Sequence, residues 1–380
     1  MRRLRWVAAG VLAAVAAAWG EVSWDEHAVV DGVRWTARAT GRWEFELGSD
    51  RGDGRALEGT VEGKLVLPAT FKNGRVTGIC DRAFAGMEGI TEVEFPEGMK
   101  TIGKGAFAGC TGLTRVIVPD SVFAVEAGAF AGCIALKEVV LGAELWQLND
   151  RVFEGCVALE RLEIRDGRRG IDIGDRAFAD CTGLTRVDIG RRCEAVGAEA
   201  FAGCTGLKEV VIHGRMDRRA FAGCDCLERV EWDREGSFSL GIWGDKRTGW
   251  GPVYAHPGDA IDSFEGCTGV REVVINAVWP GEFGLAAIFP DAYGEIRHVT
   301  ILDGSPYVPE GLFRGCAKLE EVVLPDSVKS IKADVFDGCE RLKTVRWPAE
   351  LREVDPNALR GASIEEGPVV AEEHEEGAAE

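Results

Sequence analysis

Residues 106–113 read AFAGCTGL, and the same eight letters recur at residues 200–207. Each copy holds a phenylalanine, a glycine and a cysteine in fixed order, and variants of the octapeptide follow one another along most of the chain. Self-similarity of this kind is the signature of a repeat architecture rather than of separate globular domains. The aligned phenylalanines are Phe84, Phe107, Phe130, Phe153, Phe178, Phe201, Phe221, Phe264, Phe313 and Phe336, with Leu359 in the last copy.

Most intervals between these phenylalanines are 23 residues, with single intervals of 25 and 20 and two long ones of 43 and 49. The 49-residue interval divides at Phe289, where Ile296 and Val299 restore the apolar pattern in a degraded copy. The 43-residue interval predicts a repeat enlarged by an insertion near residues 236–259, which a solenoid tolerates as a surface loop. About eleven or twelve repeats are therefore expected over residues 65–362.

Within a repeat the apolar positions are constant. In the best-preserved copy, Leu113, Val116 and Val118 are spaced like one buried face of a short strand. Pro119 ends the strand, because proline has no N–H to donate to a β-ladder. A unit of this size cannot bury its apolar side chains alone, so successive copies must stack and share a continuous core.

The units follow the pattern C-x-x-L-x-x-V-x-[IVL]-P-x-x-V-x-x-[IV]-x-x-x-A-F-x-G-C, which resembles the bacterial secreted leucine-rich repeat proteins of the BspA-like class. The segment LVLPATFKNGRVTGICDRAF, residues 65–84, resembles the opening repeat of that class. The resemblance implies an α/β fold, a leucine-rich-repeat right-handed solenoid with a parallel concave β-sheet. It implies no catalytic residues, since the class is defined by its scaffold.

The N-terminal region differs from the repeats. Residues 1–20 combine three arginines, a short apolar run and a small-x-small ending, which is the pattern of a secretory signal peptide cleaved before Glu21. An N-terminal membrane anchor is the alternative, although the run is too short to span a bilayer. Residues 21–64 are expected to form an N-terminal β cap, with residues 35–39 and 43–47 paired as a hairpin.

The charge and hydropathy of the chain argue against nucleic acid and membranes as partners. The formal net charge is −19, and loss of the three leader arginines would take it to −22, so the surface should repel nucleic acid and anionic membranes. Residues 363–380 are rich in glutamate and predict a disordered acidic tail. No second apolar run long enough to span a membrane follows the leader. The expected location is secreted or cell-surface, with the periplasm possible, and the oligomeric state is open.

Nine of the twelve cysteines stand three residues after a repeat phenylalanine. Equivalent side chains in stacked coils point the same way at about 4.8 Å, whereas a disulfide needs inclined Cβ atoms about 3.8 Å apart. Buried free thiols are therefore favoured, although an even count in a secreted chain leaves a disulfide framework open. Cys80, Cys193 and Cys226 are out of register and are the better candidates for redox chemistry.

Metal and catalytic interpretations have little support in the sequence. The chain has five histidines, and none stands at ligand spacing from a cysteine pair. Nine equivalent nucleophiles would make no mechanistic sense. We therefore expect no catalytic residues, no metal and no cofactor, and an enzyme is the least favoured alternative.

Two rows of residues are expected along the outer face of the sheet. The first alternates in charge, which places opposite charges side by side in a parallel ladder and serves stability before binding. Its members are Glu92, Arg115, Glu138, Arg161, Arg186, Glu209, Arg229, Glu272, His298, Glu321 and Thr344. The second row, two residues on, is either an apolar binding stripe or a set of good strand formers. Its apolar members are Ile117, Val140, Val211, Val274 and Val323.

Three further features are candidate ligand sites. A basic cluster suits sulfated or acidic glycans, with a solvated mixed surface as the alternative; its members are Arg161, Arg165, Arg168, Arg169 and Arg186. Aromatics of the insertion suit a sugar or a protein partner, or else pack on the neighbouring coil; they are Trp243, Trp250 and Tyr254, with His256 beside them. The tripeptide Arg51-Gly52-Asp53 is a weak integrin-type motif.

The sequence thus predicts a non-catalytic secreted or cell-surface protein that binds a protein or glycan ligand, as in adhesion. The alternative is a structural envelope or matrix component without a specific ligand. Neither nucleic acid nor a membrane span in the mature chain is expected.

Overall fold

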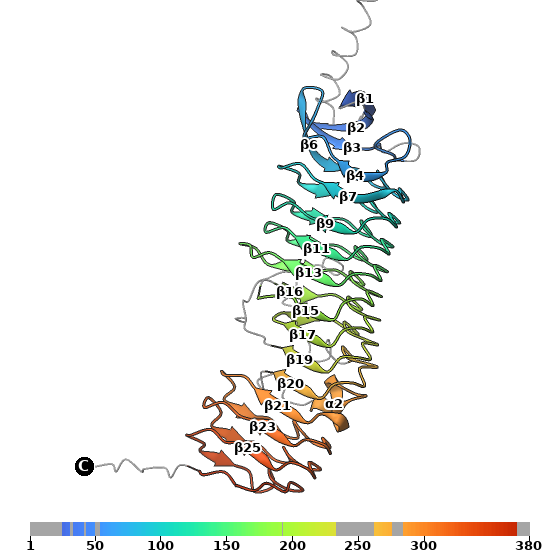
Figure 1. Ribbon diagram of the computed structural model, residues 1–380. Coiled ribbons are helices and arrows are strands. Elements are labelled where there is room, and N and C mark those ends of the chain that lie inside the picture. Colours follow the sequence, from blue (N-terminus) through green and yellow to red (C-terminus); the bar gives the residue numbers. More distant parts are fainter. Residues whose placement is uncertain are drawn as a thin grey trace, which may run out of the picture. The chain divides into compact units, whose positions relative to one another are not determined.

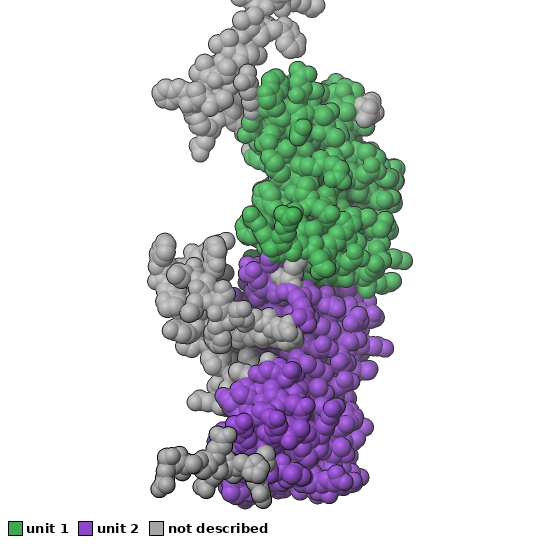
Figure 2. All heavy atoms as spheres, turned by 90° about the vertical axis from the view of Figure 1, so that its left-hand side faces the viewer, with its two compact units in different colours: residues 1–169 green, residues 170–380 purple. Residues whose placement is uncertain are grey.

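The computed structural model describes residues 25–30, 33–41, 43–49, 54–191, 193–232, 262–275 and 284–370. The chain divides into two compact units, residues 1–169 and 170–380, which are coloured separately in Figure 2. Each unit is built of parallel strands stacked coil on coil, with almost no helix (Figure 1). The predicted fold class, a leucine-rich-repeat β-solenoid, is confirmed.

Unit 1 contains a first sheet formed by the L-x-x-V-x-V segments of successive repeats. Every neighbouring pair in this sheet is parallel, as expected when each coil contributes one strand. Its strands in the described residues are β4 (Gly63–Val66), β7 (Ile90–Glu94), β9 (Arg115–Ile117), β11 (Glu138–Leu141) and β13 (Arg161–Ile164).

A second sheet of unit 1 starts with antiparallel strands and continues with parallel ones. β2 (Val33–Gly41) pairs antiparallel with β1 (Asp25–Val30) and with β3 (Glu44–Leu47), and the second of these pairings is the expected hairpin. β3 then runs parallel to β6 (Gly74–Ile79), and β5 (Thr70–Phe71) folds back on β6. The strands that follow are only two residues long: β8 (Thr101–Ile102), β10 (Ala124–Val125) and β12 (Gln147–Leu148).

Unit 2 repeats this arrangement. Its first sheet comprises β15 (Arg186–Asp188), β17 (Glu209–Ile212), β19 (Arg229–Trp232), β20 (Glu272–Ile275), β21 (His298–Ile301), β23 (Glu321–Val323) and β25 (Thr344–Arg346), all parallel. Its short strands form two groups: β14 (Ile171–Ile173), β16 (Cys193–Val196) and β18 (Arg215–Met216), then β22 (Tyr307–Val308), β24 (Ser330–Ile331) and β26 (Glu353–Val354).

The repeat phenylalanines stack inside the coils. In unit 1, the ring centroids of Phe107 and Phe130 are 5.3 Å apart with the planes 1° from parallel, and in unit 2 those of Phe201 and Phe221 are 5.1 Å apart at 2°. All these rings are fully buried. The spacing matches that of hydrogen-bonded neighbours in a sheet, so each coil buries its ring against the next and the core is continuous.

The phenylalanines on either side of the 43-residue interval, and Phe289 within the 49-residue interval, belong to the same stack of rings. Phe221 and Phe264 are 43 residues apart in sequence, yet their ring centroids lie 5.4 Å apart, so this interval spans a single coil. Phe289 lies 4.9 Å from Phe264, as expected for the degraded copy. In that copy a short helix, α2 (Leu285–Ile288), and a 3₁₀ turn, η2 (Tyr293–Glu295), replace the usual turn before β21.

Candidate functional site

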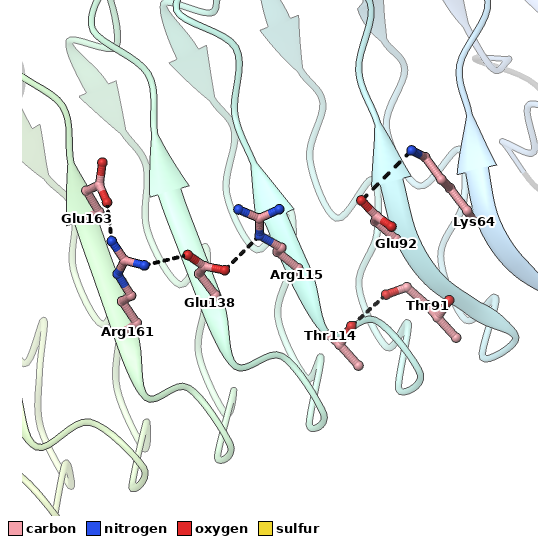
Figure 3. A network of polar contacts seen from close by, with 8 residues as sticks. All are labelled: Lys64, Thr91, Glu92, Thr114, Arg115, Glu138, Arg161 and Glu163. Atoms are coloured by element: carbon pink, nitrogen blue, oxygen red, sulfur yellow. Dashed lines mark hydrogen bonds and ion pairs between the residues drawn. The ribbon is translucent and has the colours of Figure 1, made fainter.

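A row of charged side chains crosses the first sheet of unit 1, one from each strand. The register places Lys64 beside Glu92, and then Arg115, Glu138 and Arg161 in successive strands. The Glu138 carboxylate accepts hydrogen bonds from Arg115 at 2.7 Å and from Arg161 at 3.0 Å (Figure 3). Lys64 lies 4.0 Å from Glu92 at the other end of the row. The predicted register of this row is confirmed.

Unit 2 has a row of the same kind. Glu209 lies between Arg186, at 3.2 Å, and Arg229, at 3.1 Å. Further along, the His298 Nδ1 lies 3.5 Å from the Glu321 carboxylate. Pairs exposed to this degree are each worth about 0–1 kcal/mol. The rows therefore present alternating charges that neutralise one another, and they support strand register more than the binding of an ion.

The apolar row beside the charged one is less exposed than a binding stripe requires. Val140 is 4% exposed, and Val211 and Val274 are 7% exposed, while Ile117 and Val323 are half-buried. A docking surface needs apolar area in contact with water. This observation favours the interpretation of these residues as strand formers.

Three of the five members of the predicted basic cluster, Arg161, Arg165 and Arg186, have acidic partners. Arg165 bonds the Asp120 carboxylate at 2.9 Å, and this bond together with the Ala143 N–H holds the pKa of Asp120 below its ordinary value. Arg161 and Arg186 are paired on the sheet rows described above. These pairs favour a mixed surface over an anion site. The remaining members, Arg168 and Arg169, are exposed.

The insertion lies in sequence between β19 and β20 of unit 2. Among the described residues the second sheet is followed to β18 and a further group of short strands begins at β22, while the first sheet continues through β19, β20 and β21. At the start of the insertion, Trp232 is 5% exposed and donates its Nε1–H to the Gly214 carbonyl at 3.0 Å. At its end, Asp262 pairs with Arg218 at 3.3 Å. Trp243, Trp250, Tyr254 and His256 lie outside the described residues, as do Arg51, Gly52 and Asp53.

The repeat cysteines form a second ladder inside the coils. The Cys110 thiol donates to the Phe84 carbonyl at 3.2 Å, and Cys204 makes the same bond to Phe178 at 3.2 Å. Burial raises the pKa of Cys110 to about 11 and that of Cys204 to about 12, so both thiols stay protonated at neutral pH. The bond recurs at 3.1–3.3 Å from Cys133, Cys156, Cys224, Cys267 and Cys339. Burial, bonding and raised pKa values all support the prediction of buried free thiols.

The three cysteines outside the ladder differ in exposure. Cys80 and Cys193 are 2% and 3% exposed, and burial raises the pKa of Cys193 to about 12. Cys226 is exposed. A reactive cysteine needs both access and thiolate character, so Cys226 alone of the three meets the first condition.

A family model for the BspA-type leucine-rich repeat region matches in six copies, over residues 67–172, 168–236 and 287–367. The chain belongs to the BspA-type leucine-rich repeat family. The matched ranges leave out residues 237–286, which contain most of the insertion.

Solved structures of bacterial leucine-rich repeat proteins are similar to this BspA-type chain. A T. pallidum leucine-rich repeat protein is 24% identical over 53% of this chain and 87% of its own, with a TM-score of 0.43. A Bacteroides ovatus protein is 19% identical over 90% and 91%, with a TM-score of 0.33. The pneumococcal vaccine antigen PcpA is 15% identical over 91% and 99%, with a TM-score of 0.41. No curated protein matches the chain.

Two surface features were not predicted from the sequence. A second charged column lies two residues before the phenylalanine, where Glu199 accepts from Arg176 at 2.6 Å and lies 3.7 Å from Arg219. Its signal was available, because four consecutive repeats alternate in charge at that position, with Arg176, Glu199, Arg219 and Asp262. The other feature is a pair of aromatic residues on the second sheet of unit 1, Phe123 and Trp146, each next to a two-residue strand.

The described residues form neither a metal centre nor a membrane-spanning helix. No group of three or more histidine, cysteine, aspartate or glutamate side chains in this part of the chain is placed to hold a metal ion. Nor does any helix there have the length and apolar character needed to cross a membrane.

Proposed function

We propose that the chain is a non-catalytic binding or adhesion protein, secreted or displayed at the cell surface, that recognises a protein or glycan through the surface of its solenoid. The observation that carries this proposal is the strand register. Outward side chains of the described first sheets are aligned over β4 to β13 in one unit and over β15 to β25 in the other. Stacked repeats of this kind offer an extended surface on which contacts add along the stack.

The chemistry of the repeat supports the same proposal. The cysteine is the most reactive side chain of the motif, and it is buried with its thiol bonded to the preceding coil. Export is proposed from the leader pattern of residues 1–20. Ligand contacts are proposed in the insertion, at Trp243, Trp250, Tyr254 and His256, where a solenoid can add a binding loop without disturbing its core.

Binding by residues 21–380 to a glycan array and to a panel of purified matrix proteins tests the proposal. We expect saturable binding that weakens when Trp243→Ala and Trp250→Ala are combined. Trp43→Ala is the matched control, because Trp43 is 56% exposed in the N-terminal cap and its loss should leave binding unchanged. Absence of saturable binding to every ligand would favour a structural role, and turnover of a bound ligand would contradict the non-catalytic assignment.

A further inference from the structure

Phe123 and Trp146 stand in adjacent coils on the second sheet of unit 1. Phe123 is 38% exposed and Trp146 is half-buried. Their backbones are joined directly, because the Trp146 N–H donates to the Phe123 carbonyl at 3.2 Å. The strands that follow them, β10 and β12, pair in parallel register, so the two side chains leave the sheet about one strand spacing apart, near 4.8 Å.

The fold does not require an aromatic residue at this position. In other described coils the same position holds Lys100, Lys329 or Arg352. The backbones at this position are joined by the same hydrogen bond from coil to coil, for example from the Phe123 N–H to the Lys100 carbonyl. The Lys100 Nζ lies 2.7 Å from the Glu44 carboxylate. A charged residue at this position therefore forms an ion pair at the surface, and its coil folds without an aromatic side chain. An exposed ring and a half-buried ring at consecutive positions are therefore not explained by packing, and grouped apolar residues at the surface usually mark a contact surface.

The two coils that carry the rings also carry polar side chains without a net positive charge. Gln147 is in register with Ala124, and its Nε2 donates to the Asn149 Oδ1 at 2.9 Å. The Asn149 Nδ2 donates in turn to the Glu126 carboxylate at 3.2 Å. This chain of bonds orients the Gln147 amide and the Glu126 carboxylate on the same two coils that carry the aromatic pair. Ala124, between the rings and the amides, is small and 4% exposed.

We propose that Phe123 and Trp146 form a stacking platform for a neutral saccharide, with Gln147 and Glu126 as hydrogen-bonding partners for its hydroxyl groups. This inference rests on the proposed binding function and assigns one ligand class to one site. The flat ring faces suit the apolar face of a pyranose, and amide and carboxylate oxygens accept hydrogen bonds from hydroxyl groups.

Charge and size favour a neutral sugar over other ligands. The chain carries a formal charge of −19, which disfavours sulfated or acidic glycans. A protein partner would need about 800 Å² of complementary surface on each side, whereas this aromatic pair is bordered by the ion pair of Lys100 with Glu44 and by the amides of Gln147 and Asn149. A single sugar ring or a short oligosaccharide fits a platform of two rings.

Titration of residues 21–380 with cellotetraose, maltotetraose, mannotetraose and N-acetylchitotetraose, read by saturation-transfer NMR and tryptophan fluorescence, tests the site. We expect at least one sugar to bind, and its affinity to fall about tenfold or more, equivalent to about 1.4 kcal/mol, in the Phe123→Lys, Trp146→Lys variant. Lysine occupies this position at Lys100 and Lys329, so the variant should fold. Gln147→Ala, which copies Ala124 of the neighbouring coil, should weaken binding while both rings remain.

The matched control removes exposed apolar surface elsewhere in the same coils. Ile134 and Val157 are 51% and 44% exposed, and aligned repeats have threonine there, so Ile134→Thr with Val157→Thr should leave sugar affinity unchanged. Equal affinity in the lysine variant, or no binding to any of the four sugars, would overturn the inference. If residues 21–380 still bind a ligand of the broader array or protein panel, the proposed function stands and only this site is wrong.

Discussion

At the scale of the residue, the phenylalanine and the cysteine of the A-F-x-G-C motif are buried and contact the neighbouring coil. The Phe107 ring stacks on Phe130, and the Cys133 thiol donates to the Phe107 carbonyl at 3.3 Å, so both side chains bind one coil to the next. The spacing of the motif was enough to predict this, because equivalent positions in stacked coils must lie one above the other. Backbone conformation two residues before the phenylalanine was not predicted, because Gly105 aligns there with charged residues such as Arg82.

Gly105 shares a left-handed conformation at that position with charged residues of other repeats, among them Arg82 and Glu199. Gly105 has φ +59°, and a Cβ added there would lie 3.7 Å from both the Ala108 Cβ and the Arg82 side chain, which is ordinary contact. Gly105→Ala should therefore destabilise the protein by about 1–2 kcal/mol through conformation alone. Chemical denaturation of the purified variant measures this directly, and an unchanged midpoint would contradict the account.

The reverse substitution in the preceding coil provides the control. Arg82 is exposed with φ +58°, so Arg82→Gly relieves a backbone cost of about 1–2 kcal/mol and loses about 0.5–1 kcal/mol to the freedom of glycine in the unfolded chain. We expect a net gain of about 0–1.5 kcal/mol. The two variants should thus shift the denaturation midpoint in opposite directions.

At the scale of the element, the two sheets are predictable to different degrees. The first sheet has strands of three to five residues with clear alternation, and its charge register followed from the sequence. The second sheet consists largely of two-residue strands such as β10 and β12, which are too short to show alternation. The exposure of Phe123 and Trp146 on that sheet was missed for this reason. Helix α2 was also missed, because a run of four residues cannot distinguish helix from strand.

The insertion should be dispensable for folding. β19 and β20 pair in full register across it, and Phe221 already stacks on Phe264. Replacing residues 236–259 by a short Gly-Ser linker is expected to change the free energy of unfolding by no more than about 1 kcal/mol, since loop length costs little. Deleting residues 108–130, one complete repeat, should lower stability clearly because a coil and its interfaces are lost. A large loss of the far-UV circular dichroism signal of β-structure on removal of the insertion would contradict this prediction.

At the scale of the whole molecule, the sequence was sufficient for the repeat architecture and the buried cysteines, since both follow from periodicity. It was less informative about surfaces. The basic cluster was visible as Arg161 and Arg165, but their partners Glu138 and Asp120 lie 23 and 45 residues earlier, so the neutralisation appears only once the coils are stacked. The same stacking repeats the bond from thiol to carbonyl in both units.

The ladder predicts a loss of stability at alkaline pH. The pKa of Cys110 is raised by burial from 9.0 to about 11, and that of Cys204 to about 12. Because the pKa is higher in the folded than in the unfolded chain, the stabilisation by each thiol is complete below pH 9. It is lost as pH rises through the pKa of the folded state, at about 1.4 kcal/mol per pH unit and thiol. Thermal melts from pH 8 to 11 should show the melting temperature falling above pH 9, with a shallower fall when Cys110→Ala and Cys204→Ala are combined. Equal slopes in the two proteins would exclude the ladder as the cause.

The central claim, that the residues of the repeated motif are interior scaffold, is tested most directly by counting thiols in unreduced protein with a chromogenic disulfide reagent. Of the twelve cysteines, Cys226 is exposed and the others are buried and free. We predict one rapidly reacting thiol in the native protein, removed by Cys226→Ser, and twelve after denaturation. Several rapidly reacting thiols in the native state of the Cys226→Ser variant, or few free thiols after denaturation, would contradict the account.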